Sequence, residues 1–575
     1  MIWLRLTVRA ALALCFAVPL FALTDTVPAA MYTITGTAGL DTVTISDGPG
    51  GTTTISSPTF ESVTFTNKTN VVFDGLGGGD SVTFNNANPA TGLLSLIVTN
   101  VGTVGQLSVI RYSSFGVNAT GTVDLDTLRN EVNNLEISTQ NGDVTFFERD
   151  GLVLGGVSAS LAGVRAATTG SVLVFVQAGV LTIAEGAKSG NTSGDVQVSA
   201  VTQLLGVAGV EAVRAPAGGA RVWGGAITLP SSDVRAAGSV DLNGYSIVVS
   251  GSTTLVSDAF GTNSGGILSL VTIVNGTIDV AADATLTAGG SAGADVVFGA
   301  PAVSTLGEVV SLSGDVEMRT QRFAMPAPGT LEAPLGRVLF WTYSPSDIVL
   351  GPETDLSPTA MEISDEELDR TTAPVVEVQA FFGTITVAAP FTFGSGQELI
   401  LHSPKPVTAT GTGMLSAPTL TIELAGRNGE TWTITPVSFR VTPAATVPYS
   451  EVTTLNLRGS VPSQDGIWAT NDSFDVTPSA TTTINIDGNL PAPPALGDRL
   501  LFHLEGVTSP DLITTLTPDG YQGSLTSGNR APIHFENIER FVGAPAGVPI
   551  PTLSTWMAML LAAVLAVGAT VVLKK

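Results

Sequence analysis

Cysteine, lysine and charge in general are scarce in this chain. Its single cysteine, Cys15, lies in an apolar N-terminal segment, so a mature chain without that segment has no disulfides and no thiol chemistry. Charged residues make up 13% of the 575 residues, only five residues are lysines, and the formal net charge is −25. Phosphate binding needs clusters of basic side chains, so we expect no nucleic-acid partner.

Sequence signatures of catalysis are equally scarce. The three histidines are far apart in the sequence, and no H-E-x-x-H, G-x-S-x-G or P-loop sequence occurs. Asp143, Asp195 and Asp315 recur at rough multiples of one spacing, but each follows a glycine, at a turn position that favours aspartate for backbone reasons. The sequence therefore predicts that the protein is not an enzyme. A carbohydrate-active enzyme with clustered carboxylates stays open as an alternative.

Glycine and small or β-branched apolar residues are abundant instead. The chain has 64 glycines and 44% hydrophobic residues, mostly Val, Ala, Leu and Ile mixed with Thr and Ser. Apolar and polar residues alternate at 32–35, 42–45 and 81–84, as in half-buried strands. This composition predicts many short strands joined by turns, and therefore an all-β protein.

A weak internal repeat runs through the first half of the chain. The tripeptide Gly-[Asp/Ser/Thr]-[Val/Ile] recurs at steps of about 20 residues, or of twice that, beginning at Gly121, Gly142, Gly170, Gly194, Gly238, Gly276 and Gly314. A second tripeptide, Val-Arg-Ala, begins at 164, 213 and 234. A period of about 20 residues with a strand after each glycine predicts stacked coils that bury columns of Val, Ile and Leu.

This repeat resembles the right-handed parallel β-helix of bacterial surface adhesins. The resemblance implies a solenoid over 31–320; a series of β-sandwiches is the alternative. Proline becomes frequent after 320, so we expect a β-rich region over 321–459, either sandwich-like or irregular coils. Residues 460–541 resemble a small β module of long bacterial surface proteins, and 542–549 read as a linker. The expected fold class is thus all-β, with a signal helix and a transmembrane helix at the two ends.

The N-terminal segment over 1–30 has the three parts of a secretory signal peptide. Arg5 and Arg9 supply the positive region, residues 10–23 form an apolar run, and small residues follow at 22, 29 and 30. We therefore expect a signal peptide over 1–30 that is removed after export. The apolar run over 10–23 is too short to span a bilayer comfortably.

The C-terminal end has the length and charge pattern of a membrane-spanning helix. Residues 556–573 carry no charge and are just long enough to cross a bilayer. The following Lys574 and Lys575 predict a cytoplasmic end, because cytoplasmic flanks are enriched in lysine and arginine. Together with the signal peptide, this predicts that everything in between is exported from the cytoplasm.

A short motif precedes that helix. Residues 550–575 resemble the IPTL-CTERM protein-sorting domain, a relative of the PEP-CTERM signals of Gram-negative bacteria. The residues that carry the resemblance are Ile550, Pro551, Thr552, Leu553, Ser554 and Trp556, together with the final Lys574 and Lys575. It implies that an exosortase-type transpeptidase in the inner membrane cuts the chain near this motif. The protein would then be anchored only transiently before it reaches the cell surface or the medium.

Two glycine-rich stretches suggest a metal site. Residues 36–44 and 75–83 resemble the calcium-binding nonapeptide of repeats-in-toxin proteins, which implies Ca²⁺ ligation by Asp41 and Asp80. A plain Gly-Asp turn before a strand is the alternative interpretation. No other cofactor is expected.

These observations together predict an exported surface or matrix protein of a Gram-negative bacterium with an adhesive or structural role. A solenoid rich in Thr and Ser offers a wide polar face, so polysaccharides or cell surfaces are the expected partners. Two alternatives stay open: a carbohydrate-active enzyme on the same body, and a calcium-dependent module of the repeats-in-toxin kind.

Overall fold

The computed structural model is nearly all β, as the composition predicts, with 61% of residues in strands and 1% in helix. It describes residues 24–25, 29–260, 266–290, 293–305, 307–342, 345–352, 357, 359–394, 397–424, 430–459, 471–489 and 497–542. These residues form two compact units: Met1–Glu317 with Met325–Leu335 in the first, and Met318–Ala324 with Gly336–Lys575 in the second. The described helix, α2 (Asp365–Asp369), is a single turn in unit 2 whose capping box is formed by Ser364 and Glu367.

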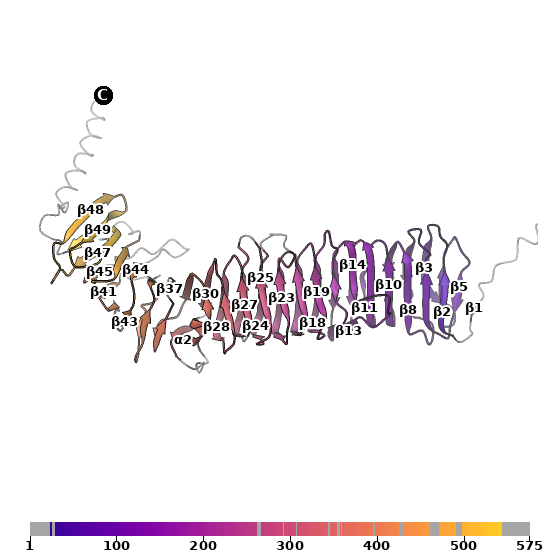
Figure 1. Cartoon of the computed structure of the whole chain (residues 1–575). Coiled ribbons are helices and arrows are strands. Elements are labelled where there is room, and N and C mark those ends of the chain that lie inside the picture. The colour runs from indigo at the N-terminus through magenta and orange to yellow at the C-terminus, as the bar shows by residue number, and fades with distance from the viewer. Residues whose placement is uncertain are drawn as a thin grey trace, which may run out of the picture. The chain divides into compact units, whose positions relative to one another are not determined.

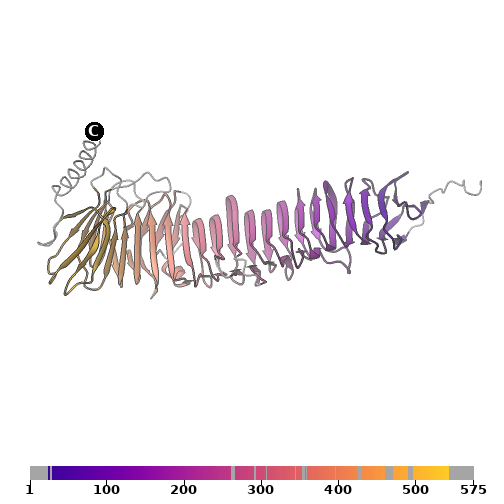
Figure 2. The same ribbon diagram turned by 90° about the horizontal axis from the view of Figure 1, so that it is seen from above.

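Unit 1 is built from three rows of parallel strands, which we name rows A, B and C (Figures 1 and 2). Row A contains β3 (Thr42–Gly48), β7 (Ser81–Asn85), β9 (Thr103–Gln106), β11 (Val123–Asn141), β12 (Val144–Glu148), β15 (Val172–Val176), β18 (Val196–Gly206), β20 (Ala220–Pro230), β22 (Val240–Ser250), β24 (Leu268–Val280) and β26 (Val296–Thr305). Row B contains β2 (Ala29–Thr35), β6 (Lys68–Asp74), β8 (Ser95–Val101), β10 (Arg111–Ala119), the middle of β11, β13 (Leu152–Leu154), β16 (Val180–Ile183) and the second halves of β18, β20, β22, β24 and β26.

Row C continues from the end of β11. It contains β14 (Val164–Thr169), β17 (Ala187–Lys188), β19 (Glu211–Ala215), β21 (Asp233–Ala236), β23 (Thr254–Ser257), β25 (Thr285–Ala288), β27 (Glu308–Ser311) and β29 (Thr330–Glu332). Strand β28 (Val316–Ala324) spans the division between the units. Near the N-terminal end, β4 (Thr52–Ser56) pairs antiparallel with β3 and β5 (Val63–Phe65), and β1 (Thr24–Asp25) pairs parallel with β5.

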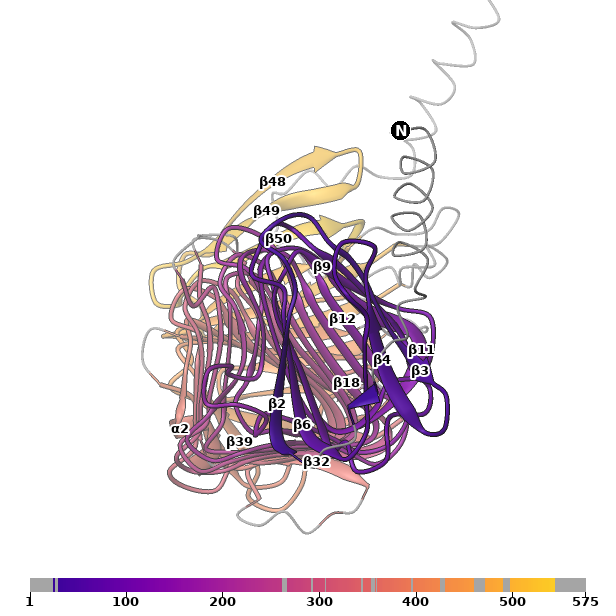
Figure 3. The same cartoon turned by 90° about the vertical axis from the view of Figure 1, so that its right-hand side faces the viewer.

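The core of unit 1 consists of columns of apolar side chains, one residue from each strand. Parallel register in row A joins Val43, Val82, Val104, Val123, Val144, Val172, Val196, Ala220, Val240, Leu268 and Val296, all at most 2% exposed. Burial of each valine contributes about 1.5–3 kcal/mol. Figure 3, which faces the N-terminal end, shows the strands of a row lying behind one another.

The register confirms most of the tripeptide repeat and corrects one member. Val123, Val144, Val172, Val196 and Val240 occupy the same position in row A. The predicted member at Gly276 is wrong, because Ile278 pairs with Ile247 and Val303 in row B, whereas Leu268 fills the position in row A. The long strand β24 supplies residues to both rows, and its two apolar stretches look alike in the sequence.

Unit 2 also contains rows of parallel strands. Its main row, row D, consists of β30 (Arg337–Thr342), β34 (Val375–Ala380), β37 (Glu398–Ser403), β40 (Thr419–Leu424), β44 (Thr454–Arg458), β46 (Thr483–Asp487) and β50 (Ile533–Ile538). A second sheet contains β32 (Ala360–Ile363), β31 (Asp347–Leu350), β35 (Ile385–Val387) and β38 (Thr408–Ala409). Row D runs across the predicted boundary between 459 and 460, because β44 pairs with β46.

A third sheet of unit 2 mixes parallel and antiparallel pairs. It contains β36 (Pro390–Thr392), β39 (Met414–Ser416), β43 (Val447–Ser450), β42 (Ser438–Thr442), β41 (Thr431–Thr435), β45 (Ser473–Val476), β47 (Arg499–Phe502) and β51 (Arg540–Val542). Strand β33 (Thr371–Thr372) follows α2, and β48 (Asp511–Thr517) with β49 (Gly520–Thr526) forms an antiparallel hairpin against β50. The core column of row D is Val338, Val376, Leu399, Leu420, Leu455, Ile484 and Ile533, all fully buried.

Candidate functional site

The outward face of row D contains a polar groove. Alternate residues of each strand point away from the core, and parallel register brings equivalent positions of neighbouring strands side by side. The groove has a volume of about 560 Å³ and lies over β40, β44, β46 and β50. Its polar lining consists of Glu423, Asn456, Arg458, Asn485, Asp487, Asn489, His534 and Glu536.

A three-residue ion cluster lies at one side of the groove. His402 Nδ1 lies 3.1 Å from Glu423 Oε2, and Arg458 pairs with the other carboxylate oxygen. The hydrogen bond with His402 and the charge of Arg458 lower the pKa of Glu423 against the opposing effect of burial. Glu423 is therefore a fixed anionic acceptor, and its side chain is only 14% exposed.

A ladder of amides runs across the same face. Asn485 Nδ2 donates to Asn456 Oδ1 at 2.7 Å, Asn456 Nδ2 donates to Thr421 Oγ1 at 2.8 Å, and Thr421 Oγ1 donates to Glu398 Oε1 at 2.5 Å. Each link joins two neighbouring strands of row D. The ladder fixes the side chains in one orientation and leaves further donor and acceptor positions of the amides toward the groove.

The far side of the groove is more open. Asp487 accepts hydrogen bonds from Asn489 N at 2.9 Å and Asn537 Nδ2 at 2.7 Å. It lies in register with Glu536, and both His534 and Glu536 are exposed. The groove thus presents planar amides, carboxylates and one guanidinium, groups that pair well with hydroxyl-bearing ligands.

The three histidines are far apart in the sequence, but two of them lie on one face of row D. His402 on β37 and His534 on β50 project from the same face of row D, whereas His503 directly follows β47 of the third sheet. Sequence reasoning missed the groove, because its residues come from four strands separated by loops of unequal length. The one available signal was the alternation within each strand, as in Thr419–Leu424.

The structure brings together the two aspartates of the predicted calcium site. Asp41 N donates to Asp80 Oδ1 at 2.8 Å, and both side chains are fully buried. The carboxylate of Asp41 accepts from Thr37 N at 2.8 Å and from the hydroxyls of Thr37 and Thr59. Hydrogen-bond donors thus occupy both oxygens of Asp41, and within the described part of the chain Asp80 Oδ2 has no hydrogen-bond partner.

The same corner recurs in unit 2, at positions with no nonapeptide. Asp472 N donates to Asp498 Oδ1 at 2.5 Å, and Asp498 Oδ2 also lacks a hydrogen-bond partner among the described residues. In both units the aspartate Oδ2 covers a glycine: an added Cβ would lie 2.3 Å from it at Gly75 and 2.6 Å from it at Gly488. This recurrence supports the alternative that Gly and Asp together form a structural corner between coils.

Metal ligation by Asp41 and Asp80 stays a prediction. Calcium takes six to eight oxygen ligands. The described residues include no group of three or more His, Cys, Asp or Glu side chains that could hold a metal ion. Burial raises the pKa of Asp80, and the nearby charge of Asp41 adds to this effect. The pair therefore has one open carboxylate oxygen, and further ligands would have to be backbone carbonyls or water.

The corner in unit 2 predicts a dependence of stability on pH. Burial raises the pKa of Asp498 to about 8, with added repulsion from Asp472, Glu539 and Asp487, although the Asp472 N–H opposes this shift. Since the folded pKa lies above the unfolded value near 3.8, the protonated form stabilises the fold below about pH 4. That contribution is lost as the pH rises toward 8.

We therefore expect Asp498→Asn to be more stable than the wild type at pH 8, by about 1–3 kcal/mol, with a smaller difference at pH 5. Thermal unfolding of both proteins at the two pH values is the measurement. Asp511→Asn, at an exposed position of β48, is the matched control, because Asp511 is not among the charges that act on Asp498. A destabilised Asp498→Asn variant at pH 8 would contradict the prediction.

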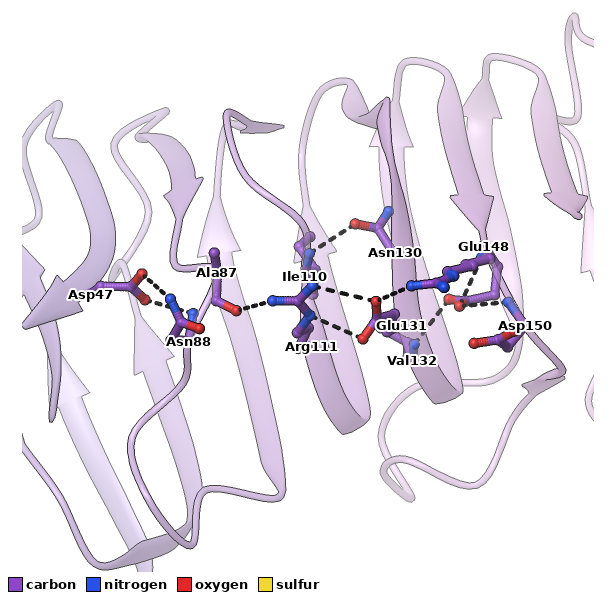
Figure 4. Close-up of polar contacts among 11 residues, drawn as sticks. Asp47, Ala87, Asn88, Ile110, Arg111, Asn130, Glu131, Val132, Glu148 and Asp150 are labelled. Carbon is purple, nitrogen blue, oxygen red and sulfur yellow. Dashed lines mark hydrogen bonds and ion pairs between the residues drawn. The ribbon is translucent and has the colours of Figure 1, made fainter. Parts of the chain in front are cut away.

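Unit 1 carries a separate polar ladder across neighbouring strands (Figure 4). Arg111 donates to Ala87 O at 2.8 Å and pairs with Glu131 at 2.9 Å, and Arg149 pairs with the same glutamate at 3.0 Å. The hydrogen bond and charge of Arg111, with those of Arg149, lower the pKa of Glu131. Two guanidinium groups thus share one carboxylate, and the ladder links β10, β11 and the turn after β12.

The neighbouring Glu148 is a buried part of the same region. Its carboxylate accepts from the backbone N–H groups of Val132 at 3.0 Å, Arg149 at 2.9 Å and Asp150 at 3.3 Å. Figure 4 shows it between the strand that contains Val132 and the turn at Asp150. Burial raises the pKa of Glu148 to about 8. Because backbone groups surround it, Glu148 holds a turn in place.

Two of the three periodic aspartates hold turns of unit 1 through their carboxylates. Asp143 Oδ1 accepts from Ser171 N at 2.8 Å, and Asp195 Oδ1 accepts from Gly219 N at 2.8 Å. Asp315 N donates to Asp295 Oδ1 at 2.8 Å. Asp143 and Asp195 thus hold the backbone that precedes a later strand, as expected, whereas in the third bond the carboxylate belongs to Asp295 and Asp315 contributes its backbone N–H.

The predicted signal and sorting segments lie largely outside the described residues. This applies to residues 1–23 and 26–28, to the predicted membrane-spanning helix 556–573, and to all of the sorting motif, namely Ile550, Pro551, Thr552, Leu553, Ser554, Trp556, Lys574 and Lys575. Among the residues that the structure describes, no helix has the length and apolar character needed to cross a membrane. Comparison of the chain with protein-family models, with curated proteins and with solved structures finds no match.

Proposed function

We propose that this chain is an exported surface or matrix protein with an adhesive or structural role, and that its body is a right-handed parallel β-helix. The observation that supports this most is the unbroken register of row A, in which each strand pairs in parallel with a strand about one coil further on. Such stacking produces a rigid scaffold whose outward side chains are free to vary. A stalk or matrix component needs those two properties.

The route to the surface is the second part of the proposal. The N-terminal signal peptide directs export, and the helix 556–573 anchors the chain in the inner membrane until an exosortase-type transpeptidase cuts near Ile550–Leu553. The supporting observation is the order of motif, apolar stretch and terminal lysines in the sequence. The mature protein then stays at the outer envelope or enters the medium.

Intact mass of the protein from the surface and medium of its native host tests this route. We expect the C-terminal segment that follows the cut near the motif to be missing, and to be retained in a strain without the exosortase. A matched variant with Pro551→Ala in the motif should also retain the segment. A full-length C-terminus in every strain would identify a permanent anchor instead.

A carbohydrate-active enzyme is the second candidate, and one observation favours it. Glu423, Asp487 and Glu536 line the same groove of row D, and Asp487 and Glu536 are in register on neighbouring strands. Paired carboxylates about 5 Å apart are the arrangement of retaining glycosidases. Release of new reducing ends from a polysaccharide, abolished by Asp487→Asn, would support it.

A calcium-dependent module is the third candidate. It relies on Asp41 and Asp80, which meet at one corner of unit 1. A ligand that binds only the folded state raises the melting temperature. Melting in calcium chloride and in a chelator therefore tests it, and equal melting temperatures would remove this candidate.

A further inference from the structure

A continuous line of outward residues crosses all seven strands of row D. Parallel register places in one line, which we name the outer line, Trp341, Gln379, His402, Glu423, Arg458, Asp487 and Glu536. With about 4.8 Å between strands, the line is roughly 29 Å long. The polar groove covers its second half.

The first half of the outer line ends in an aromatic cluster. Trp341 meets Phe381 in a T-shaped contact with ring centroids 6.1 Å apart, and Phe381 meets Phe382 at 4.6 Å. The two phenylalanines directly follow β34 and are 47% and 53% exposed. Arg319 of the same unit lies over the Trp341 ring at 5.3 Å, which supports the indole from one side.

Exposed aromatic rings of this size are costly to leave in water and usually mark a contact surface. An occupant that suits both halves must offer apolar faces to the rings and many hydroxyl groups to the amides and carboxylates. Pyranose sugars combine these two properties, because their C–H groups lie on one face and their hydroxyls at the edge. The strand spacing of about 4.8 Å is also close to the length that one sugar ring adds to an extended chain.

We infer that the outer line of row D is a binding track for an extended, uncharged polysaccharide, with sugar rings stacked on Phe381 and Phe382 and hydroxyls bound by Asn456, Asn485 and Arg458. This inference rests on the proposed adhesive function and names its ligand class and contact residues.

The charge of the track decides between polysaccharide classes. Glu423, Asp487 and Glu536 line the groove with Arg458, and Arg458 is already paired with Glu423. The whole chain has a formal charge of −25. Polyuronates and sulfated chains would therefore be repelled, whereas an uncharged glucan meets only hydrogen-bonding groups.

Affinity electrophoresis of the full-length protein tests the track. The native gels contain hydroxyethylcellulose, laminarin or polygalacturonate. We expect retardation by at least one of the two neutral glucans and none by polygalacturonate. The double variant Phe381→Ala/Phe382→Ala should bind the neutral glucan at least tenfold more weakly. Because the two replaced side chains are exposed, we expect the double variant to fold, and its melting temperature checks this.

Tyr245→Ala is the matched control, because Tyr245 is an aromatic residue of unit 1 that is 54% exposed and is not part of the outer line. It should bind as the wild type does. Absence of retardation by both neutral glucans would overturn the inference, as would equal retardation of the double variant.

Light scattering measures the oligomeric state of the wild type and of the double variant. A dimer that the double variant converts to a monomer would show that a second copy of the chain covers the rings, which also overturns the inference. The gels test glucan binding, whereas the intact-mass measurement tests export and processing. A negative result in one leaves the other unaffected, so failures of the two proposals can be distinguished.

Discussion

Gly170→Ala is expected to unfold its part of unit 1 locally and to cost about 3 kcal/mol or more. Gly170 has a φ of +112°, which side chains with a Cβ rarely adopt. An added Cβ would also lie 2.1 Å from the carbonyl oxygen of Gly142, which precedes β12. That oxygen belongs to the backbone of the turn between β11 and β12, so relief requires this turn and the segment before β15 to separate.

Gly209→Ala separates the two causes of that loss. Gly209 has a φ of +80°, but nothing lies within 4 Å of the added Cβ. The control therefore has the conformational cost alone, about 1–2 kcal/mol. Hydrogen exchange of the peptides that cover β12, β15, β18 and β19 is the measurement, because parts of a structure can open locally. Equal loss of protection around the two sites would contradict the role of the close approach.

Trp432→Ala is expected to destabilise unit 2 by about 3–5 kcal/mol. Trp432 on β41 is fully buried and is the largest side chain among the fully buried residues that the structure describes. Its ring stacks on Phe474 of β45 with centroids 5.7 Å apart at 24°. Truncation leaves a cavity that strands fixed by parallel register cannot collapse to fill.

The conservative variant Trp432→Phe should behave differently. Within the described part of the chain, Trp432 Nε1 has no hydrogen-bond partner, so phenylalanine removes an unsatisfied donor while it keeps most of the apolar contact. We expect a cost below about 1.5 kcal/mol. Urea unfolding followed by circular dichroism measures both variants. Equal destabilisation by the two substitutions would mean that shape, and not apolar contact, determines the site.

The prediction of strands and of the repeat in unit 1 was possible because the inward column tolerates few residue types. Val123, Val144, Val172 and Val196 stand out for that reason. Ala220 was missed, because the column demands only an apolar residue of suitable size, and the turn before it reads Gly218-Gly219. Steps of unequal length, such as the one from Val43 to Val82 that contains β4 and β5, hide the period further.

The groove of row D could not be predicted in the same way. Glu423, Arg458 and His402 meet through strand register, but loops of different length separate their strands, so no fixed spacing connects them. The outward positions of successive strands also share no residue type, because a solvent-exposed position tolerates many side chains. The glycine–aspartate corners were visible in the sequence only where the loop between them is short, as at Gly75 and Asp80.

The register of row A has an evolutionary consequence. Val144, Val172 and Val196 occupy one position on three successive strands of row A, so deletion of the segment from one strand to the next would bring the following strand into the same contacts. Duplication of such a segment would add a strand to the row with equally little disturbance, because each strand pairs mainly with its neighbours in the row. Unequal recombination within the gene can therefore change the number of strands in row A without a change of sequence in the outer line of unit 2. The length of row A and the residues of the outer line are open to selection separately.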